Sequence, residues 1–150
     1  MGNLGLQETV LLLFVFVLPA LYLNSLRKTL LLIDLKNRTI GPNYVWLMFV
    51  IFFNLYFHFK LVSSIATSLS NEFADRNIAV DEKRPGETIG FINSIFLVLW
   101  VINAFTKFDL EAINFILSLG ALITWILYWV KINKYKKLLI ADNNYKRNIE

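Results

Sequence analysis

Residues 112–130 read AINFILSLGALITWILYWV, and the chain continues as KINKYKK to residue 137. The first run contains no Asp, Glu, Lys or Arg, and about 20 apolar residues let a helix cross roughly 30 Å of hydrocarbon. Aromatic rings followed by lysines are typical of the place where such a helix leaves the membrane on the cytoplasmic side. The stretch therefore predicts a transmembrane helix with a basic cytoplasmic tail at residues 131–150. The predicted membrane-interface anchors are Trp125, Tyr128, Trp129, Lys131 and Lys134, together with Lys60 near the end of an earlier apolar run.

Three further apolar runs precede this one, at residues 9–26, 44–62 and 88–106. The chain is 57% hydrophobic and 17% charged, whereas about a quarter of the residues in an average soluble domain are charged. Because lipid offers no partners for unpaired backbone groups, apolar segments of this length fold as helices. We therefore expect an all-α integral membrane protein, a single membrane domain over residues 1–150 that forms a bundle of four hydrophobic helices.

The second apolar run is predicted to continue beyond the membrane as an amphipathic helix. Apolar residues recur every four positions from Leu61 to Phe73, and polar residues, Glu72 among them, occupy the other side. We expect one helix over about residues 44–74, bent or broken near Asn54 and extended into the cytoplasm. The predicted helical segments are thus about 9–26, 44–74, 88–106 and 112–130.

The number of membrane crossings has two interpretations. Four crossings with both termini inside place most basic residues in the cytoplasm but leave those between Arg27 and Arg38 outside, together with Lys107. If the region around Asn54 instead dips into the membrane and returns, three segments cross and Lys107 is the only basic residue outside. We favour four crossings, because re-entrant backbone must be covered by protein or water. Both interpretations place the charged loop around Pro85 and the C-terminus in the cytoplasm.

Uncharged polar residues within the apolar runs are the candidate contact sites. His58 is the only histidine, and Asn54 lies four residues before it, so the two share a face of a continuous helix. We expect them to hydrogen-bond to neighbouring helices, and the alternative is that they line a pore. The predicted intramembrane polar contacts are Asn54, His58, Asn93 and Asn103, and the small residues predicted to bring helices close together are Gly90, Ser94, Gly120 and Thr124.

The sequence lacks the residues from which common active sites and metal sites are built. It contains no cysteine and one histidine, too few ligands for a usual zinc site, and it has no glycine-rich phosphate loop or nucleophile elbow. We therefore predict that the protein is not an enzyme and has no catalytic residue, cofactor or metal ion. The net charge of +4 is carried largely by residues that flank the apolar runs. The predicted partners are accordingly membrane lipid and other membrane protein chains, and not nucleic acid.

Five short elements stand in order along the chain: PNYVW, FFN, SLSNEFADRNI, KRPGETIGF and ILYWVKINKYKKLL. Together they resemble a group of small bacterial multi-span inner-membrane proteins of unknown function. The resemblance covers about residues 42–139. It implies a bacterial cytoplasmic (inner) membrane and the same four-element layout, and it brings no activity with it.

The expected function follows from the small size, the missing chemistry and the helix-packing residues. We expect a non-enzymatic accessory or scaffold subunit that assembles laterally with other membrane chains, as a homo-oligomer or in a hetero-complex. The alternative is a homo-oligomeric pore or channel with a polar lining at Asn54 and His58.

Overall fold

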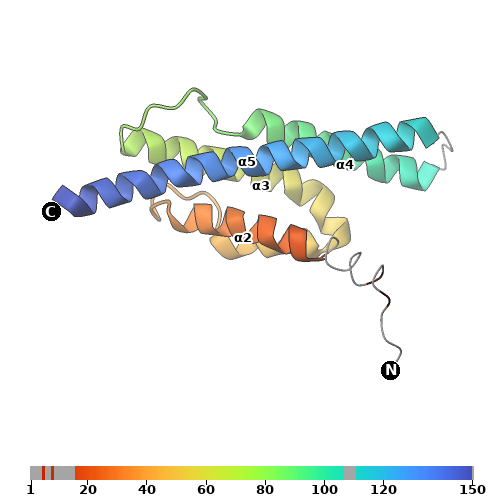
Figure 1. The fold of residues 1–150 in the computed structure, drawn as a ribbon, viewed down its shortest axis with the longest axis horizontal. Coiled ribbons are helices and arrows are strands. Elements are labelled where there is room, and N and C mark those ends of the chain that lie inside the picture. Colours follow the sequence, from red (N-terminus) through yellow and green to blue (C-terminus); the bar gives the residue numbers. More distant parts are fainter. Residues whose placement is uncertain (1–4, 6–7, 9–15, 107–110, 150) are drawn as a thin grey trace.

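The fold is all-helical over the residues that the computed structural model describes, which are 5, 8, 16–106 and 111–149. Residues 9–15 of the first predicted run, and Lys107, therefore lie outside the described residues. Figure 1 shows the helices arranged along the longest one, α5. In chain order the helices are α2 (Leu18–Leu31), the 3-10 helix η2 (Pro42–Phe49), α3 (Ile51–Asp75), α4 (Glu87–Thr106) and α5 (Glu111–Ile149), with no strand among the described residues.

Helix α5 is a single helix of 39 residues, about 58 Å long at 1.5 Å per residue. The apolar run at residues 112–130 and the segment predicted as a basic tail therefore belong to one helix. No glycine or proline follows Gly120, so nothing in the local sequence breaks the helix. Glu111 lies in its first turn and Lys146 and Arg147 lie in its last turn, where their charges complement the helix dipole.

Two described helices, α4 and α5, are long and apolar enough to cross a membrane. Only 22% and 11% of the residues in their most apolar stretches are buried within the chain. A helix whose apolar side chains point outward needs another apolar environment. These two helices therefore indicate membrane association, and the structure does not establish four spans.

The second half of α5 packs against α2 and α3 to form a compact unit, here called the head. The head comprises α2 from Ser25 onward with its following connection (residues 25–41), α3 from Leu61 onward, and α5 from Lys131 onward. Figure 1 shows α3 and α2 on either side of this part of α5. The side chains buried in and next to it include Tyr22, Leu26, Leu30, Ile33, Leu61, Ile65, Leu69, Phe73, Tyr128, Ile132, Tyr135 and Leu139.

The apolar run at residues 44–62 does not form one continuous helix. Helix η2 ends at Val50, an extended residue (φ −84°, ψ 102°) that also caps α3, and the chain reverses there. The two arms are antiparallel, because Thr39 Oγ1 donates to the Ser64 carbonyl (2.8 Å) and Thr39 N donates to Ser68 Oγ (2.9 Å). The break thus lies four residues before Asn54, near which the sequence predicts a bend or break in a helix over residues 44–74.

The end of α3 is set by Asn77, which adopts a left-handed conformation (φ 56°). The Ile78 amide then donates to the Phe73 carbonyl (2.9 Å) and the Asn77 amide donates to the Ala74 carbonyl (3.2 Å). These two bonds are the Schellman arrangement that commonly closes a helix. They place Arg76 at the C-cap, directly after the last helical residue, where it reaches the rest of the head.

Helix α2 begins at Leu18, with Pro19 in its first turn. Phe16 and Val17 directly before α2 are π-helical, so Pro19 lies close to the point where the helical geometry changes.

Candidate functional site

The predicted polar contacts mainly join α4 to its neighbours. Asn93 Nδ2 donates to Thr124 Oγ1 (3.0 Å) and to the Ala121 carbonyl (3.0 Å), both on α5. Nearer the far end of the same pair of helices, Asn103 donates to Asn114. These amides therefore bridge α4 and α5 within one chain.

The predicted small residues lie where helices approach closely. A Cβ atom added to Gly90 would lie 2.5 Å from Val62 Cγ1 on α3 and 2.9 Å from Tyr128 Cε2 on α5. A Cβ atom on Gly120 would lie 2.5 Å from the Phe96 ring on α4. Gly90 therefore occupies the place where three helices meet.

His58 lies within the chain at the contact between α3 and α4. Its side chain is 3% exposed, and Nδ1 lies 2.5 Å from Ser94 Oγ. Ser94 Oγ in turn donates to the Gly90 carbonyl (2.9 Å). Ser94, predicted as a packing residue, is thus also the hydrogen-bond partner of the histidine.

Three of the predicted polar residues border one cavity of about 380 Å³. It lies between α2, η2, α3, α4 and α5. Asn54 Oδ1 is buried there and has no hydrogen-bond partner among the described residues. The lining residues are Pro19, Tyr22, Leu23, Met48, Phe49, Asn54, His58, Asn93, Leu97, Ala121, Leu122 and Trp125. Sequence reasoning selected these polar residues singly and did not place them together.

The predicted interface anchors fall into different environments. Lys60 and Lys134 are exposed, Trp125 and Trp129 are half-buried, and Lys131 pairs with Glu82 of the loop before α4. Tyr128 differs from the other predicted anchors, because its side chain is 1% exposed and packs in the core near Gly86 and Gly90. Its ring also meets Tyr22 edge-on at 6.3 Å, so it belongs to the interior of the helix bundle.

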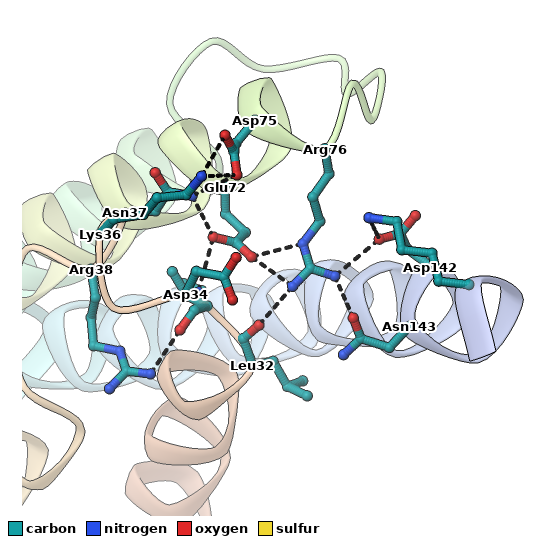
Figure 2. A network of polar contacts seen from close by, with 12 residues as sticks. Leu32, Asp34, Lys36, Asn37, Arg38, Glu72, Asp75, Arg76, Asp142 and Asn143 are labelled. Carbon is teal, nitrogen blue, oxygen red and sulfur yellow. Dashed lines mark hydrogen bonds and ion pairs between the residues drawn. The ribbon is translucent and has the colours of Figure 1, made fainter. Parts of the chain in front are cut away.

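The head contains an ionic network that we call the clamp, formed by Asn37, Glu72, Arg76, Asp142 and Asn143. Figure 2 shows Glu72 between the connection that follows α2 and the guanidinium of Arg76. Glu72 is fully buried. Its Oε2 accepts from Asn37 Nδ2 (2.8 Å) and from the Asp34 amide (3.0 Å), and its Oε1 accepts from Arg76 Nε (2.7 Å).

Arg76 connects this carboxylate to α5 and to the end of α2. Its Nη1 lies 3.0 Å from Asp142 Oδ2 and also bonds to Asn143, and its Nη2 donates to the Leu32 carbonyl (3.1 Å). Burial alone would lower the pKa of Arg76, but the hydrogen bonds to Glu72 and Asp142 raise it. A hydrogen bond from Lys146 and a weaker effect of the one from Arg76 hold the pKa of Asp142 below its ordinary value. Arg76 and Asp142 therefore stay charged at neutral pH, and the clamp ties all three elements of the head together.

Sequence reasoning placed Glu72 on the polar side of an amphipathic helix and missed the clamp. The i, i+4 spacing of Glu72 and Arg76 was the one local signal. Their other partners, Asn37 and Asp142, lie 35 and 66 residues away in the chain. Helical periodicity cannot distinguish a solvated carboxylate from a buried and paired one.

The arrangement offers interhelical contacts and a cavity. In the part of the chain that the structure describes, no three His, Asp or Glu side chains gather as a metal site would require. No protein-family model, curated protein or solved structure shows significant similarity to this chain.

Proposed function

We propose that the chain is a non-enzymatic accessory or scaffold subunit of a bacterial cytoplasmic membrane. In this proposal α4 and the first half of α5 form a membrane-crossing hairpin, and the head lies at the cytoplasmic surface. The observation that carries it is the contrast along α5, whose first half is largely uncovered and whose second half is packed into the head. The 20 residues Glu111–Val130 extend about 30 Å, which matches the hydrocarbon thickness of a bilayer.

The hairpin of η2 and α3 supports the three-crossing arrangement. Residues 42–49 in a 3-10 helix extend about 16 Å, and the first ten residues of α3 extend about 15 Å, so neither arm crosses alone. Val45 and Phe57, one on each arm, are buried, and α2 and α4 pack against the hairpin. This supplies the protein cover that re-entrant backbone needs. It also keeps the basic residues around Arg27 and Arg38 on the same side as the tail.

Sidedness is tested by single cysteines in this cysteine-free chain. We expect Glu111→Cys, at the exposed start of α5, to react with a membrane-impermeant maleimide in intact cells. Asp81→Cys in the loop after α3 and Leu35→Cys in the connection after α2 should react only after permeabilisation. Both positions are strongly exposed, so protection reports location and not burial. Reaction of Leu35→Cys in intact cells, with Asp81→Cys still protected, would refute the re-entrant hairpin in favour of four crossings.

Lateral assembly is the second part of the proposal. The crossing hairpin presents an apolar surface through which it can pack against other membrane chains. The Asn93 amide is not available for such contacts, because it hydrogen-bonds to α5 of the same chain. We expect native mass spectrometry of the protein released from lipid discs to show species heavier than one 17.5 kDa chain. Species at integer multiples indicate a homo-oligomer, and other masses indicate a hetero-complex. A single monodisperse monomer in several lipid compositions would contradict the scaffold role. The exposed apolar residues of this hairpin include Ile92, Ile95, Leu99, Ile102, Phe115, Ile116, Leu119, Leu122, Ile123, Ile126 and Leu127.

The pore alternative has less support. Asn54 and His58 border a cavity lined by helices of the same chain, and His58 is bonded to Ser94 of that chain. A pore lining would require both side chains to face an axis shared between chains.

A further inference from the structure

We propose that the cavity lined by Asn54, His58 and Asn93 binds an uncharged lipid alcohol, with the hydroxyl group inside and the chain directed toward the bilayer. This proposal rests on the membrane placement proposed above and adds a ligand to it. The cavity volume of about 380 Å³ falls in the range of roughly 300–1,000 Å³ typical of small-molecule sites. That space accommodates the polar end and the first part of a chain, and not an entire phospholipid.

The absence of charge in the lining determines the charge of the ligand. None of the lining residues is Asp, Glu, Lys or Arg, and most of them are aliphatic or aromatic. A charged group transferred into such a space would lose its hydration without gaining an ion partner, at a cost of several kcal/mol or more. A neutral ligand avoids this cost. Fatty acids and phospholipid headgroups are therefore disfavoured as the inserted group.

Donor counting at His58 determines which polar group fits. A serine hydroxyl carries a single hydrogen, and Ser94 donates that hydrogen to the Gly90 carbonyl. The imidazole must therefore donate its Nδ1–H to Ser94 Oγ, which leaves Nε2 of the neutral ring as an acceptor. No hydrogen bond to Nε2 exists among the described residues.

Asn54 supplies a second acceptor on the same face of α3. Its Oδ1 is buried at the cavity without a hydrogen-bond partner among the described residues. A buried acceptor left unpaired costs about 1–3 kcal/mol. The Asn54 amide also carries Nδ2–H donors, so His58 and Asn54 together offer both acceptors and donors. A hydroxyl group both donates and accepts, and it is the simplest uncharged group on a lipid that matches them.

The opening of the cavity points to the bilayer as the source of the ligand. Phe49 and Leu122 line the cavity and are 44% and 50% exposed, so the cavity reaches the surface beside them. Leu122 lies in the apolar first half of α5, which is the part proposed to cross the membrane. A ligand that enters there comes from lipid and not from water.

The test uses hexadecanol carrying a diazirine at mid-chain, added to the full-length protein in phosphatidylcholine discs. We expect saturable photolabelling of cavity residues that is competed by hexadecanol, but not by hexadecane or hexadecyl phosphate. Asn54→Leu should weaken labelling by about fivefold, the equivalent of one ordinary hydrogen bond. Ala121→Leu, which fills the space, should weaken it at least as much. Asn103→Leu, on α4 outside the cavity lining, is the matched control and should label as the parent does.

A stability measurement keeps the outcome interpretable. Because the Asn54 side chain has no hydrogen-bond partner in the described part of the chain, Asn54→Leu should not lower the thermal midpoint of the ligand-free protein. Equal competition by hexadecane, or unchanged labelling of Ala121→Leu, would overturn the assigned site. The absence of saturable labelling would overturn it as well. If cysteine labelling still gives the proposed sidedness in those cases, only the ligand site fails and the membrane placement stands.

Discussion

Replacing Arg76 with leucine is expected to destabilise the head by about 3–5 kcal/mol, because it leaves a buried carboxylate without its counter-ion. Glu72 is 0% exposed and Arg76 is 9% exposed, so water cannot take over the lost contacts. The same change removes the bonds from Arg76 to α5 and to the Leu32 carbonyl. The expected result is a large drop in the thermal midpoint, measured by tryptophan and tyrosine fluorescence in mild detergent, with early proteolysis within residues 32–41.

A double variant and a surface variant control this experiment. Glu72→Leu combined with Arg76→Leu removes both charges and should recover much of the lost stability, since apolar replacement of a buried ion pair is often tolerated. Lys36→Leu breaks an ion pair with Asp75 in which Lys36 is 66% exposed, and it should shift the midpoint little. If Arg76→Leu is as mild as Lys36→Leu, the clamp does not hold the head together.

Replacing Gly90 with alanine is expected to cost about 1–3 kcal/mol, the usual cost of overpacking a tight interior. Intrinsic helix propensity acts in the opposite direction, because alanine is favoured over glycine by about 1 kcal/mol within a helix. Steric contact should prevail here. The new Cβ would lie 2.5 Å and 2.9 Å from the two γ-methyl groups of Val62, and a branched side chain held close to its backbone has little freedom to move aside.

A second substitution, at Val62, provides a rescue experiment for Gly90→Ala. Val62→Ala removes both γ-methyl groups, so Gly90→Ala should be milder in that background than in the parent. The size of this recovery measures the steric coupling between α3 and α4 in a double-mutant cycle. Additive effects of the two substitutions on the unfolding midpoint would show that the helices do not approach as closely as the structure has them.

The sequence predicted the apolar helices better than the way they pack. The run at residues 88–106 corresponds to α4 within one residue, and residues 112–130 lie inside α5. Both are long and apolar, so the pattern alone indicates a helix. The sequence does not distinguish a reversal at Val50 from a helix that continues across the membrane, because no glycine or proline stands between Asn43 and Asn54 to mark a turn.

The cavity is a second feature that the sequence does not predict, although it does identify the polar residues that line it. Asn54, His58 and Asn93 were chosen because polar residues in apolar runs need partners. Their meeting in one cavity depends on the relative register of α3, α4 and α5, which is fixed by side-chain packing at positions such as Gly90. Contacts of this kind join residues that are far apart in the chain, and no local pattern in a single sequence encodes them.

The unbroken course of α5 has a mechanical consequence. A helix with no hinge between its two halves behaves as a lever, and the contact of Tyr128 with Gly90 lies near its fulcrum. When a bilayer becomes thinner, a spanning helix accommodates the change largely by tilting, and tilts of about 20° are ordinary. Over the second half of α5, such a tilt would swing the far end through about 10 Å. In the proposed membrane placement, a change in bilayer thickness would thereby be converted into a displacement of the head.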